Sequence, residues 1–286
     1  MLLRIVTAVI LIPLVVALVW FAPPMALAGA AALVACLALV EFLHLGERMG
    51  LRGFKKWTVA CSVLLVYAQY SLGLDVTRTF GTDLVFIRRV EGPYISLEAV
   101  LLIFVFGCAA IGMATRRPLP EVLPAIAISS AGLMFIAFPF SYLVRLNEID
   151  RAGRQLVLFT LCLIWAGDML AYFVGRFAGR LRMAPLLSPK KTWEGAAGNV
   201  IGSLLVAAAF ARWIEIDPAK LLIIAGVANI AGQAGDLIES AYKRGAVVKD
   251  SGTLLPGHGG MLDRIDSLIL AAPVVWALYV LAARAS

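Results

Sequence analysis

About nine apolar runs, each long enough to cross a lipid bilayer, constrain the fold of this chain more than any other feature. They lie at about residues 5–21, 25–45, 58–74, 96–115, 122–144, 156–177, 195–214, 219–240 and 267–284. About 20 consecutive apolar residues cross the hydrocarbon core as one helix, which satisfies its backbone polar groups internally. The sequence therefore predicts an all-α, polytopic integral membrane protein with about nine transmembrane helices.

Composition excludes a soluble alternative. The 286 residues are 62% hydrophobic and 15% charged, whereas a soluble domain is about half apolar and a quarter charged. Too few polar residues remain to cover a soluble core of this size. The first run is longer than a usual signal-peptide core, and further runs follow at once, so we expect an uncleaved first helix.

The chain has no ligand set for zinc. Cys36, Cys61, Cys108 and Cys162 lie singly inside apolar runs and are expected to be small buried hydrophobes. The two histidines, His44 and His258, are far apart in the sequence.

Lysine and arginine set the expected orientation. About 16 of the 25 basic residues fall in connections on the N-terminal side of the membrane, and about nine on the other. This asymmetry predicts a multi-pass protein of the cell (inner) membrane with its N-terminus in the cytoplasm. The formal charge of +7 is attributed to loops that face anionic lipid, with no nucleic-acid partner. Residues 1–150 are expected to hold about five spans, and residues 151–286 a catalytic region with two cytoplasmic motif loops.

Polar residues concentrate on one face of the run at 219–240. Their spacing of i, i+4, i+7, i+11 and i+14 is that of one helical face; they are Asn229, Gln233, Asp236, Ser240 and Lys243, with Glu239 beside them. Lipid leaves such a stripe unsatisfied, so it must face a cavity or a partner helix. For the two amides, interhelical hydrogen bonding and a site role stay open alternatives. For Asp236 a functional role is favoured.

Three further charged or ionisable side chains lie inside apolar runs. Asp168 is in the middle of its run, with Tyr172 four residues later on the same face, and a site role is favoured over a simple ion pair. Glu41 and His44 lie near the expected cytoplasmic end of the second run. For both we expect an interfacial, snorkelling position.

The connection before the last run gathers carboxylates and glycines. Asp263 and Asp266 start the final helix three residues apart, where an acid, most easily Asp266, can be an ordinary cap. Gly259 and Gly260 just upstream allow backbone N–H groups to approach a ligand. Carboxylates on separate helices, Asp236 and Asp263, suit a hard cation such as Mg²⁺. Basic residues ring the same mouth: Lys190, Lys191, Lys243, Arg244, Lys249 and Arg264. These residue types predict phosphoryl or nucleotidyl transfer.

The stretch "SAYKRGAVVKDSGTLLPGHGGMLDRID" at 240–266 identifies a family. It resembles the signature of phosphatidate cytidylyltransferases (CDP-diacylglycerol synthases), read as S-x-x-K-R-x₄-K-D-x-G-x-x-L-P-x-H-G-G-x-x-D-R-x-D. "WAGDMLAYFVGR", "LSPKKTWEG" and "GQAGDLIES" upstream are also similar to blocks of that family. The resemblance covers roughly the C-terminal half.

The resemblance implies that CTP and phosphatidate react to give CDP-diacylglycerol and pyrophosphate in phospholipid biosynthesis, with Mg²⁺ required and a second, monovalent cation and a homodimer expected. It implies that Asp236 and Asp263 hold the metal and that Lys243 and Arg244 act on the phosphates. The other implied substrate-binding residues are Ser188, Lys190, Lys191, Ser240, Lys249, His258, Gly259, Gly260 and Arg264. Further candidates for supporting or metal-ligand roles are Asp168, Glu194, Glu239 and Asp266.

Three other functions fit parts of the pattern. An ion-coupled transporter could use the polar stripe of the sixth and eighth helices, but it predicts paired repeats, and none is visible. A CDP-alcohol type of lipid transferase needs a D-G-x₂-A-R pattern, which the chain lacks. A scaffold assembled through small residues leaves the charged connection unexplained.

Overall fold

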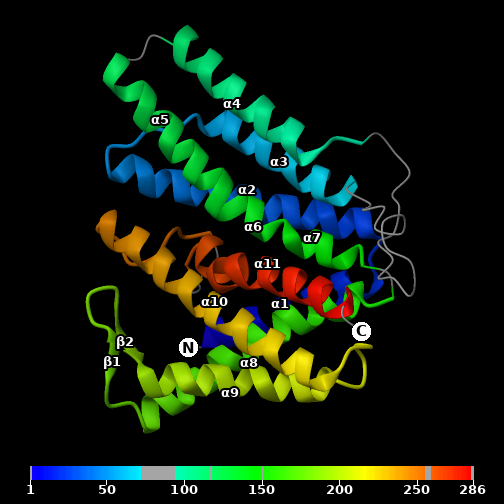
Figure 1. Ribbon diagram of the computed structural model, residues 1–286. Coiled ribbons are helices and arrows are strands. Elements are labelled where there is room, and N and C mark those ends of the chain that lie inside the picture. Colours follow the sequence, from blue (N-terminus) through cyan, green and yellow to red (C-terminus); the bar gives the residue numbers. More distant parts are fainter. Residues whose placement is uncertain (1, 72–93, 116–117, 150, 255–258, 285–286) are drawn as a thin grey trace. The chain divides into compact units, whose positions relative to one another are not determined.

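The computed structural model describes residues 2–71, 94–115, 118–149, 151–254 and 259–284, with side chains from residue 9 onward (Figure 1). Its helices are α1 (Leu2–Phe21), α2 (Pro24–Arg48), α3 (Lys55–Ser71), α4 (Leu97–Ala114), α5 (Leu119–Gly132), the π-helical η2 (Leu133–Ala137), α6 (Phe138–Phe140), α7 (Tyr142–Asn147), α8 (Gly153–Phe177), α9 (Trp193–Phe210), α10 (Pro218–Gly245) and α11 (Leu262–Arg284). Each predicted apolar run lies mostly in helix over its described residues, although α9 ends four residues before the predicted end at 214, so the all-α membrane fold is confirmed.

The predicted count of nine spans is not confirmed. Within the described residues, seven helical segments are long and apolar enough to cross a membrane. α3 has 17 residues, and the apolar part of α1, Val9–Phe21, is also short for a span. Residues 75–95, which connect the third and fourth predicted spans, fall almost wholly outside the described residues.

A small antiparallel hairpin stands in the polar connection before α9. Strands β1 (Arg182–Ala184) and β2 (Ser188–Thr192) pair with Arg182 opposite Thr192 and Ala184 opposite Ser188. Thr192 ends the hairpin and caps α9, because its Oγ1 accepts a hydrogen bond from Gly195 N at 3.1 Å. The hairpin therefore fixes the two lysines of β2 next to the start of a membrane helix.

The chain divides into two compact units, each considered by itself. The described part of the first unit holds residues 2–71, 94–115, 118–145, 242–254 and 259–265, and that of the second holds 146–149, 151–241 and 266–284. α10 and α11 contribute residues to both. The predicted functional division at residue 150 stays a prediction.

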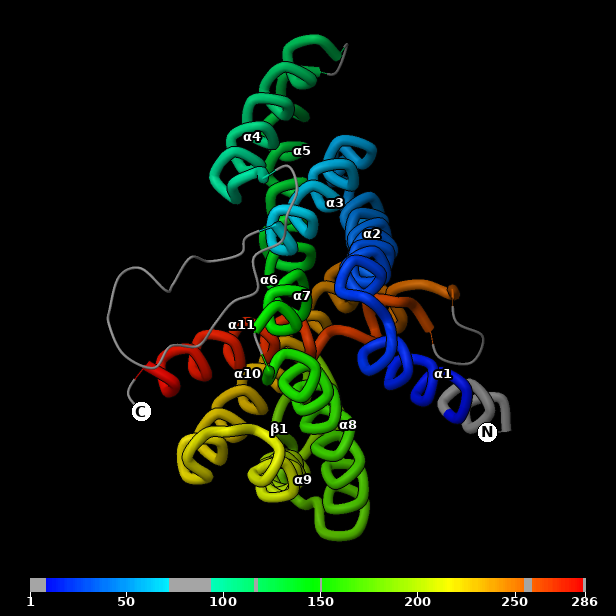
Figure 2. The backbone as a smooth tube through the Cα atoms, turned by 90° about the vertical axis from the view of Figure 1, so that its right-hand side faces the viewer, coloured from blue at the N-terminus to red at the C-terminus, as the bar shows by residue number. Residues whose placement is uncertain are grey.

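In the first unit, α2, α3, α4 and α5 lie side by side (Figures 1 and 2). Phe54, Cys61, Leu65, Phe104 and Cys108 are among the residues of its apolar core. Cys61 and Cys108 are buried, as predicted from the sequence, whereas Cys36 and Cys162 are only half-buried.

In the second unit, α8 and α9 pack closely through glycines (Figure 2). A Cβ at Gly202 would lie 2.8 Å from the carbonyl oxygen of Ala166, and one at Gly198 would lie 2.9 Å from the Val174 side chain. Small residues of this kind let membrane helices approach until polar groups meet. The close contact of α8 with α9 brings together Asp168 and Asn199, two polar residues of the candidate site.

Candidate functional site

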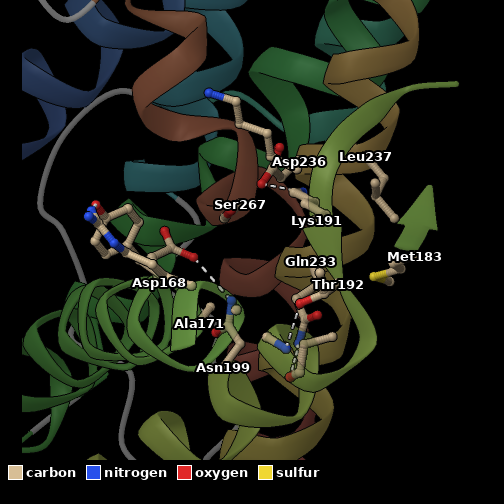
Figure 3. A pocket seen from close by; sticks show the side chains of 16 residues that line it. Asp168, Ala171, Met183, Lys191, Thr192, Asn199, Gln233, Asp236, Leu237 and Ser267 are labelled. Carbon is tan, nitrogen blue, oxygen red and sulfur yellow. Dashed lines mark hydrogen bonds and ion pairs between the residues drawn. The ribbon is translucent and has the colours of Figure 1, made fainter. Parts of the chain in front are cut away.

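The second unit contains a pocket with a volume of about 530 Å³, which lies within the usual range for small-molecule sites (Figure 3). Its walls come from α8, the hairpin, α9, α10 and α11. Among the predicted site residues, it is lined by Asp168, Lys190, Lys191 and Asp236. Gln233 and Tyr172 also line it, so part of the polar face of α10, Gln233 and Asp236, meets a cavity.

Lys191 and Asp236 form an ion pair across this pocket, with Nζ 2.5 Å from Oδ2 (Figure 3). Their side chains are 28% and 29% exposed. A pair that keeps this much solvent contact is worth little net energy, so each partner can exchange the other for a ligand charge. The arrangement offers one cationic and one anionic group to the same cavity.

Next to the ion pair, a hydrogen-bond network joins α8, α9 and α10. Asn229 Nδ2 donates to Asn199 Oδ1 at 2.6 Å and to Ser203 Oγ at 2.5 Å. Gln233 Nε2 donates to Asn229 Oδ1 at 2.7 Å, and Asn199 Nδ2 donates to Asp168 Oδ1 at 3.1 Å. Interhelical hydrogen bonding is therefore confirmed for Asn229, while Gln233 both bonds and lines the pocket. The network holds the Asp168 carboxylate in place.

Three carboxylates on α10 and α11 gather in the second unit. Oxygen atoms of Asp236, Glu239 and Asp266 lie within 4.8 Å of one another. All-oxygen donor sets of this kind suit a hard divalent cation. Glu239, which is 3% exposed, is the most buried of the three. The donor set therefore fits a metal ion, and it brings Glu239 and Asp266 to Asp236.

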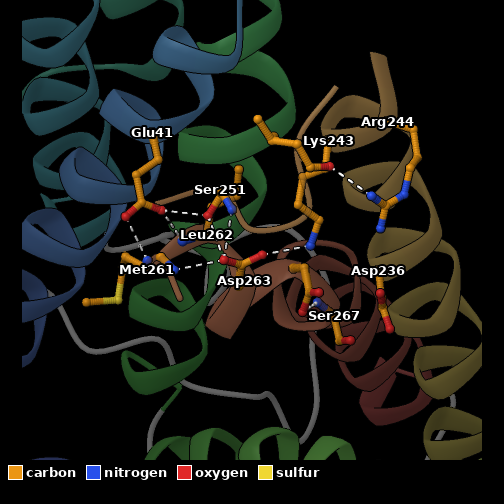
Figure 4. Close-up of polar contacts among 12 residues, drawn as sticks. Glu41, Asp236, Lys243, Arg244, Ser251, Met261, Leu262, Asp263 and Ser267 are labelled. Atoms are coloured by element: carbon orange, nitrogen blue, oxygen red, sulfur yellow. Dashed lines mark hydrogen bonds and ion pairs between the residues drawn. The ribbon is translucent and has the colours of Figure 1, made fainter. Parts of the chain in front are cut away.

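Asp263 sits in the first unit, in a different set of contacts (Figure 4). Its Oδ1 lies 2.7 Å from Lys243 Nζ, and its Oδ2 accepts hydrogen bonds from Ser251 N at 3.0 Å, Ser251 Oγ at 3.0 Å and Gly260 N at 2.8 Å. The pair is buried, with side-chain exposures of 11% for Lys243 and 8% for Asp263. The Gly260 N–H predicted to face a ligand thus donates to Asp263. The predicted pairing of Asp263 with Asp236 joins two units and stays a prediction.

Gly259 shows why this turn requires glycine. Its φ of +80° lies in the left-handed region, where side chains are disfavoured. A Cβ there would also lie 2.7 Å from Asp263 Oδ2. The backbone bends so tightly over the carboxylate that a side chain would be in collision with it.

The expectation of a snorkelling Glu41 is wrong. This α2 side chain is 8% exposed. Its carboxylate accepts hydrogen bonds from Ser251 Oγ at 2.8 Å, Met261 N at 2.9 Å and Leu262 N at 2.9 Å (Figure 4). Its donors lie more than 200 residues away in the sequence, so no local pattern indicated the contact. His44 is exposed, as expected, with Nε2 2.7 Å from Lys55 Nζ.

The remaining predicted residues are dispersed. Arg244, Lys249 and Arg264 are exposed, and Arg244 donates to the Val248 carbonyl oxygen at 2.9 Å. Ser240 is buried on α10, and Ser188 is half-buried at the start of β2; neither lines the pocket. Glu194 accepts a hydrogen bond from Leu181 N at 3.2 Å, next to the hairpin. His258 lies outside the described residues.

Comparison with known proteins identifies the family. The model of the "Cytidylyltransferase family" matches residues 2–282. The chain belongs to this family. It is 39% identical over 150 residues to the "Phosphatidate cytidylyltransferase" of Bacillus subtilis (strain 168), covering 52% of the chain and 56% of the relative. The protein of that name from Staphylococcus saprophyticus is 41% identical over 145 residues, 50% of the chain and 56% of the relative.

A third relative matches over a longer span. The "Phosphatidate cytidylyltransferase" of Brucella abortus biovar 1 (strain 9-941) is 33% identical over 242 residues, covering 78% of the chain and 83% of the relative. Against the first two relatives, the match spans little more than half of their length. The resemblance inferred from the motifs is confirmed. None of these matches supports a transporter.

Proposed function

We propose that this member of the family transfers the cytidylyl group of CTP to phosphatidate, giving CDP-diacylglycerol and pyrophosphate. One observation carries the proposal: the pocket that brings basic residues of the hairpin to Asp236, one of three clustered carboxylates on membrane helices. Cationic groups bind a triphosphate, and carboxylates bind the cation that accompanies it. The names of the relatives supply phosphatidate as the acceptor and the cytidylyl group as what is transferred.

The chemistry requires positioning rather than a strong base. A phosphate oxygen of phosphatidate attacks the α-phosphorus of CTP, and the bond from that phosphorus to the β-phosphate oxygen breaks, releasing pyrophosphate. The attacking phosphate monoester has a second pKa of about 6, so it is largely ionised at neutral pH.

The chain's own groups have separate roles. Lys190 and Lys191 line the pocket and are proposed to neutralise the triphosphate and the departing pyrophosphate. Lys243 and Arg244 are proposed to contribute further positive charge. Asp168, held by Asn199, orients a donor group of a substrate.

Asp236 and Asp263 are proposed to hold Mg²⁺, with Glu239 and Asp266 as additional ligands. When bound, the ion neutralises phosphate charge and aligns the reacting groups. Lys191 would exchange its ion pair with Asp236 for a contact with phosphate, leaving Asp236 available to the metal. A second, monovalent cation remains part of the proposal.

The proposal includes orientation and assembly. Because basic residues favour the cytoplasmic side of bilayers, we place the N-terminus and the hairpin in the cytoplasm, in the cell (inner) membrane. There the pocket meets both cytosolic CTP and the headgroup of a membrane lipid. A homodimer is proposed from the family resemblance. The molecular mass of the purified protein in a mild detergent or a nanodisc tests this proposal.

The test is a transfer assay on the purified full chain. Detergent micelles containing phosphatidate, labelled CTP and Mg²⁺ should yield labelled CDP-diacylglycerol, and Asp236→Asn should reduce the rate by at least about 100-fold. The exposed Glu47→Gln, on α2, is the matched charge-removing control and should be active. Absence of product across detergents and divalent metals would contradict the proposal.

A further inference from the structure

Glu41 ties α2 to the motif turn, which the structure describes at residues 250–254 and 259–262. Its Oε2 accepts hydrogen bonds from Ser251 Oγ and Leu262 N, and its Oε1 accepts one from Met261 N (Figure 4). Because the side chain is 8% exposed, these donors replace the water that an ionised carboxylate binds. Both described halves of the turn are therefore anchored on one carboxylate.

Two glycines of the turn make room for this carboxylate. A Cβ at Gly252 would lie 2.5 Å from Glu41 Oε1, and one at Gly260 would lie closer still to Glu41 Oε2. Contacts this short are repulsive and force neighbouring atoms to move. Gly252 is not among the described residues with positive φ. Glycine is therefore required at this position by the close contact with Glu41 and not by the backbone conformation. Part of the glycine pattern of the motif thus follows from Glu41.

The same contacts lead to Asp263. Ser251 Oγ lies 2.8 Å from Glu41 Oε2 and 3.0 Å from Asp263 Oδ2, so a single hydroxyl proton is shared between, or alternates between, two carboxylates. Ser251 N also donates to Asp263, and Leu262, the residue directly before Asp263, donates its N–H to Glu41. A shift of Glu41 must therefore shift the groups that orient Asp263.

We propose that Glu41 is a positioning residue, which fixes the motif turn and, through Ser251 and Leu262, the carboxylate of Asp263. Its effect on turnover rests on the proposed transferase function, whereas its effect on the turn does not. The proposal also explains what an N-terminal helix contributes, because α2 provides the rigid framework against which the motif turn is held. Rigid support of this kind is what sites that act by positioning require.

Proteolysis tests the turn independently of any activity. Lys249 is exposed and directly precedes the turn, so trypsin cleavage after it reports opening of this segment. Glu41→Ala should speed this cleavage about tenfold or more, because the buried donors lose their acceptor. Cleavage after Arg182, in the hairpin of the second unit, is the internal reference and should not change. Glu47→Ala, an exposed change on the same helix, is the control. Unchanged cleavage after Lys249 would overturn the proposal.

A double-mutant cycle tests the contact itself. Gly252→Ala places a methyl group against Glu41, and it should speed cleavage about tenfold in the wild-type background. In the Glu41→Ala background the same methyl has space, and its effect should fall below about threefold. Equal effects in both backgrounds would show that Gly252 and Glu41 are not coupled, against the proposal.

Kinetics test the consequence for the reaction. Glu41→Ala should lower kcat about 10- to 100-fold with less than about a threefold change in KM for CTP, since the substrates still bind but Asp263 is misplaced. Glu41→Gln keeps the side-chain volume and one acceptor oxygen, so it should recover part of kcat and also serves if the alanine variant fails to fold. If the wild type shows no transfer, the proposed function fails, whereas the trypsin cleavage experiments still decide whether Glu41 holds the motif turn. An active wild type with full kcat in Glu41→Ala refutes the positioning role.

Discussion

Asp263→Asn should destabilise the chain because it leaves the Lys243 ammonium buried without its counterion. The two side chains are 2.7 Å apart and only 11% and 8% exposed. Removing one partner of a buried pair costs about 3–5 kcal/mol. Asparagine has the same shape, and its oxygen can keep the hydrogen bonds from Ser251 and Gly260, so the loss comes mainly from the unpaired charge. We expect a loss near the lower value, about 3 kcal/mol.

A reversible unfolding titration in mixed detergent micelles measures this difference. The double variant Lys243→Met with Asp263→Asn removes both charges, and it should regain at least about 2 kcal/mol relative to Asp263→Asn alone. Lys249→Gln removes an exposed charge from the same connection and should change stability by less than about 0.5 kcal/mol. Lys243→Met alone completes the comparison. If the losses of Asp263→Asn and Lys243→Met add up to the loss of the double variant within about 0.5 kcal/mol, the two side chains are not coupled and the reasoning is refuted.

Three other predictions follow from the second unit and the topology. Gly167→Ala would press a methyl group against Asn199 Oδ1, and it should cost about 1–3 kcal/mol in the same unfolding assay; Gly29→Ala, with open space around its Cβ position, should cost nothing, and equal losses would contradict the packing argument. Lys191→Met should raise the KM for CTP about tenfold or more, measured by initial rates; an unchanged KM removes Lys191 from triphosphate binding. Val247 is 90% exposed, so Val247→Cys, in a background without the four native cysteines, should react with a membrane-impermeant maleimide only from the cytoplasmic side. Labelling from the outside would contradict the predicted orientation.

The helices and part of the site could be predicted from local patterns. Apolar runs locate membrane helices because lipid forces the backbone to bond within each segment. The i, i+4, i+7 spacing from Asn229 through Gln233 to Asp236 placed these residues on one face, and two of them, Gln233 and Asp236, line a pocket. Asn199 and Ser203 were missed, although they stand four residues apart on α9 and show the same periodicity. The hairpin is too short to produce a clear alternating pattern.

The rest of the site depends on contacts between distant segments. Glu41 showed only a carboxylate near the end of an apolar run, and its partners lie 210 to 221 residues away. The i, i+3 spacing already places Glu239 beside Asp236, but nothing in the sequence indicates that Asp266, on another helix, joins them. Family motifs identify which residues matter, but the contacts that orient them come from packing.

The position of the isotope in the product tests the central claim most directly. The purified chain is supplied with phosphatidate, Mg²⁺ and CTP labelled with ³²P at either the α- or the γ-phosphate, and the lipid and aqueous phases are separated. Attack at the α-phosphorus predicts that the α-label enters the lipid phase while the γ-label leaves as pyrophosphate. Retention of the α-label in water, or entry of the γ-label into lipid, would contradict cytidylyl transfer.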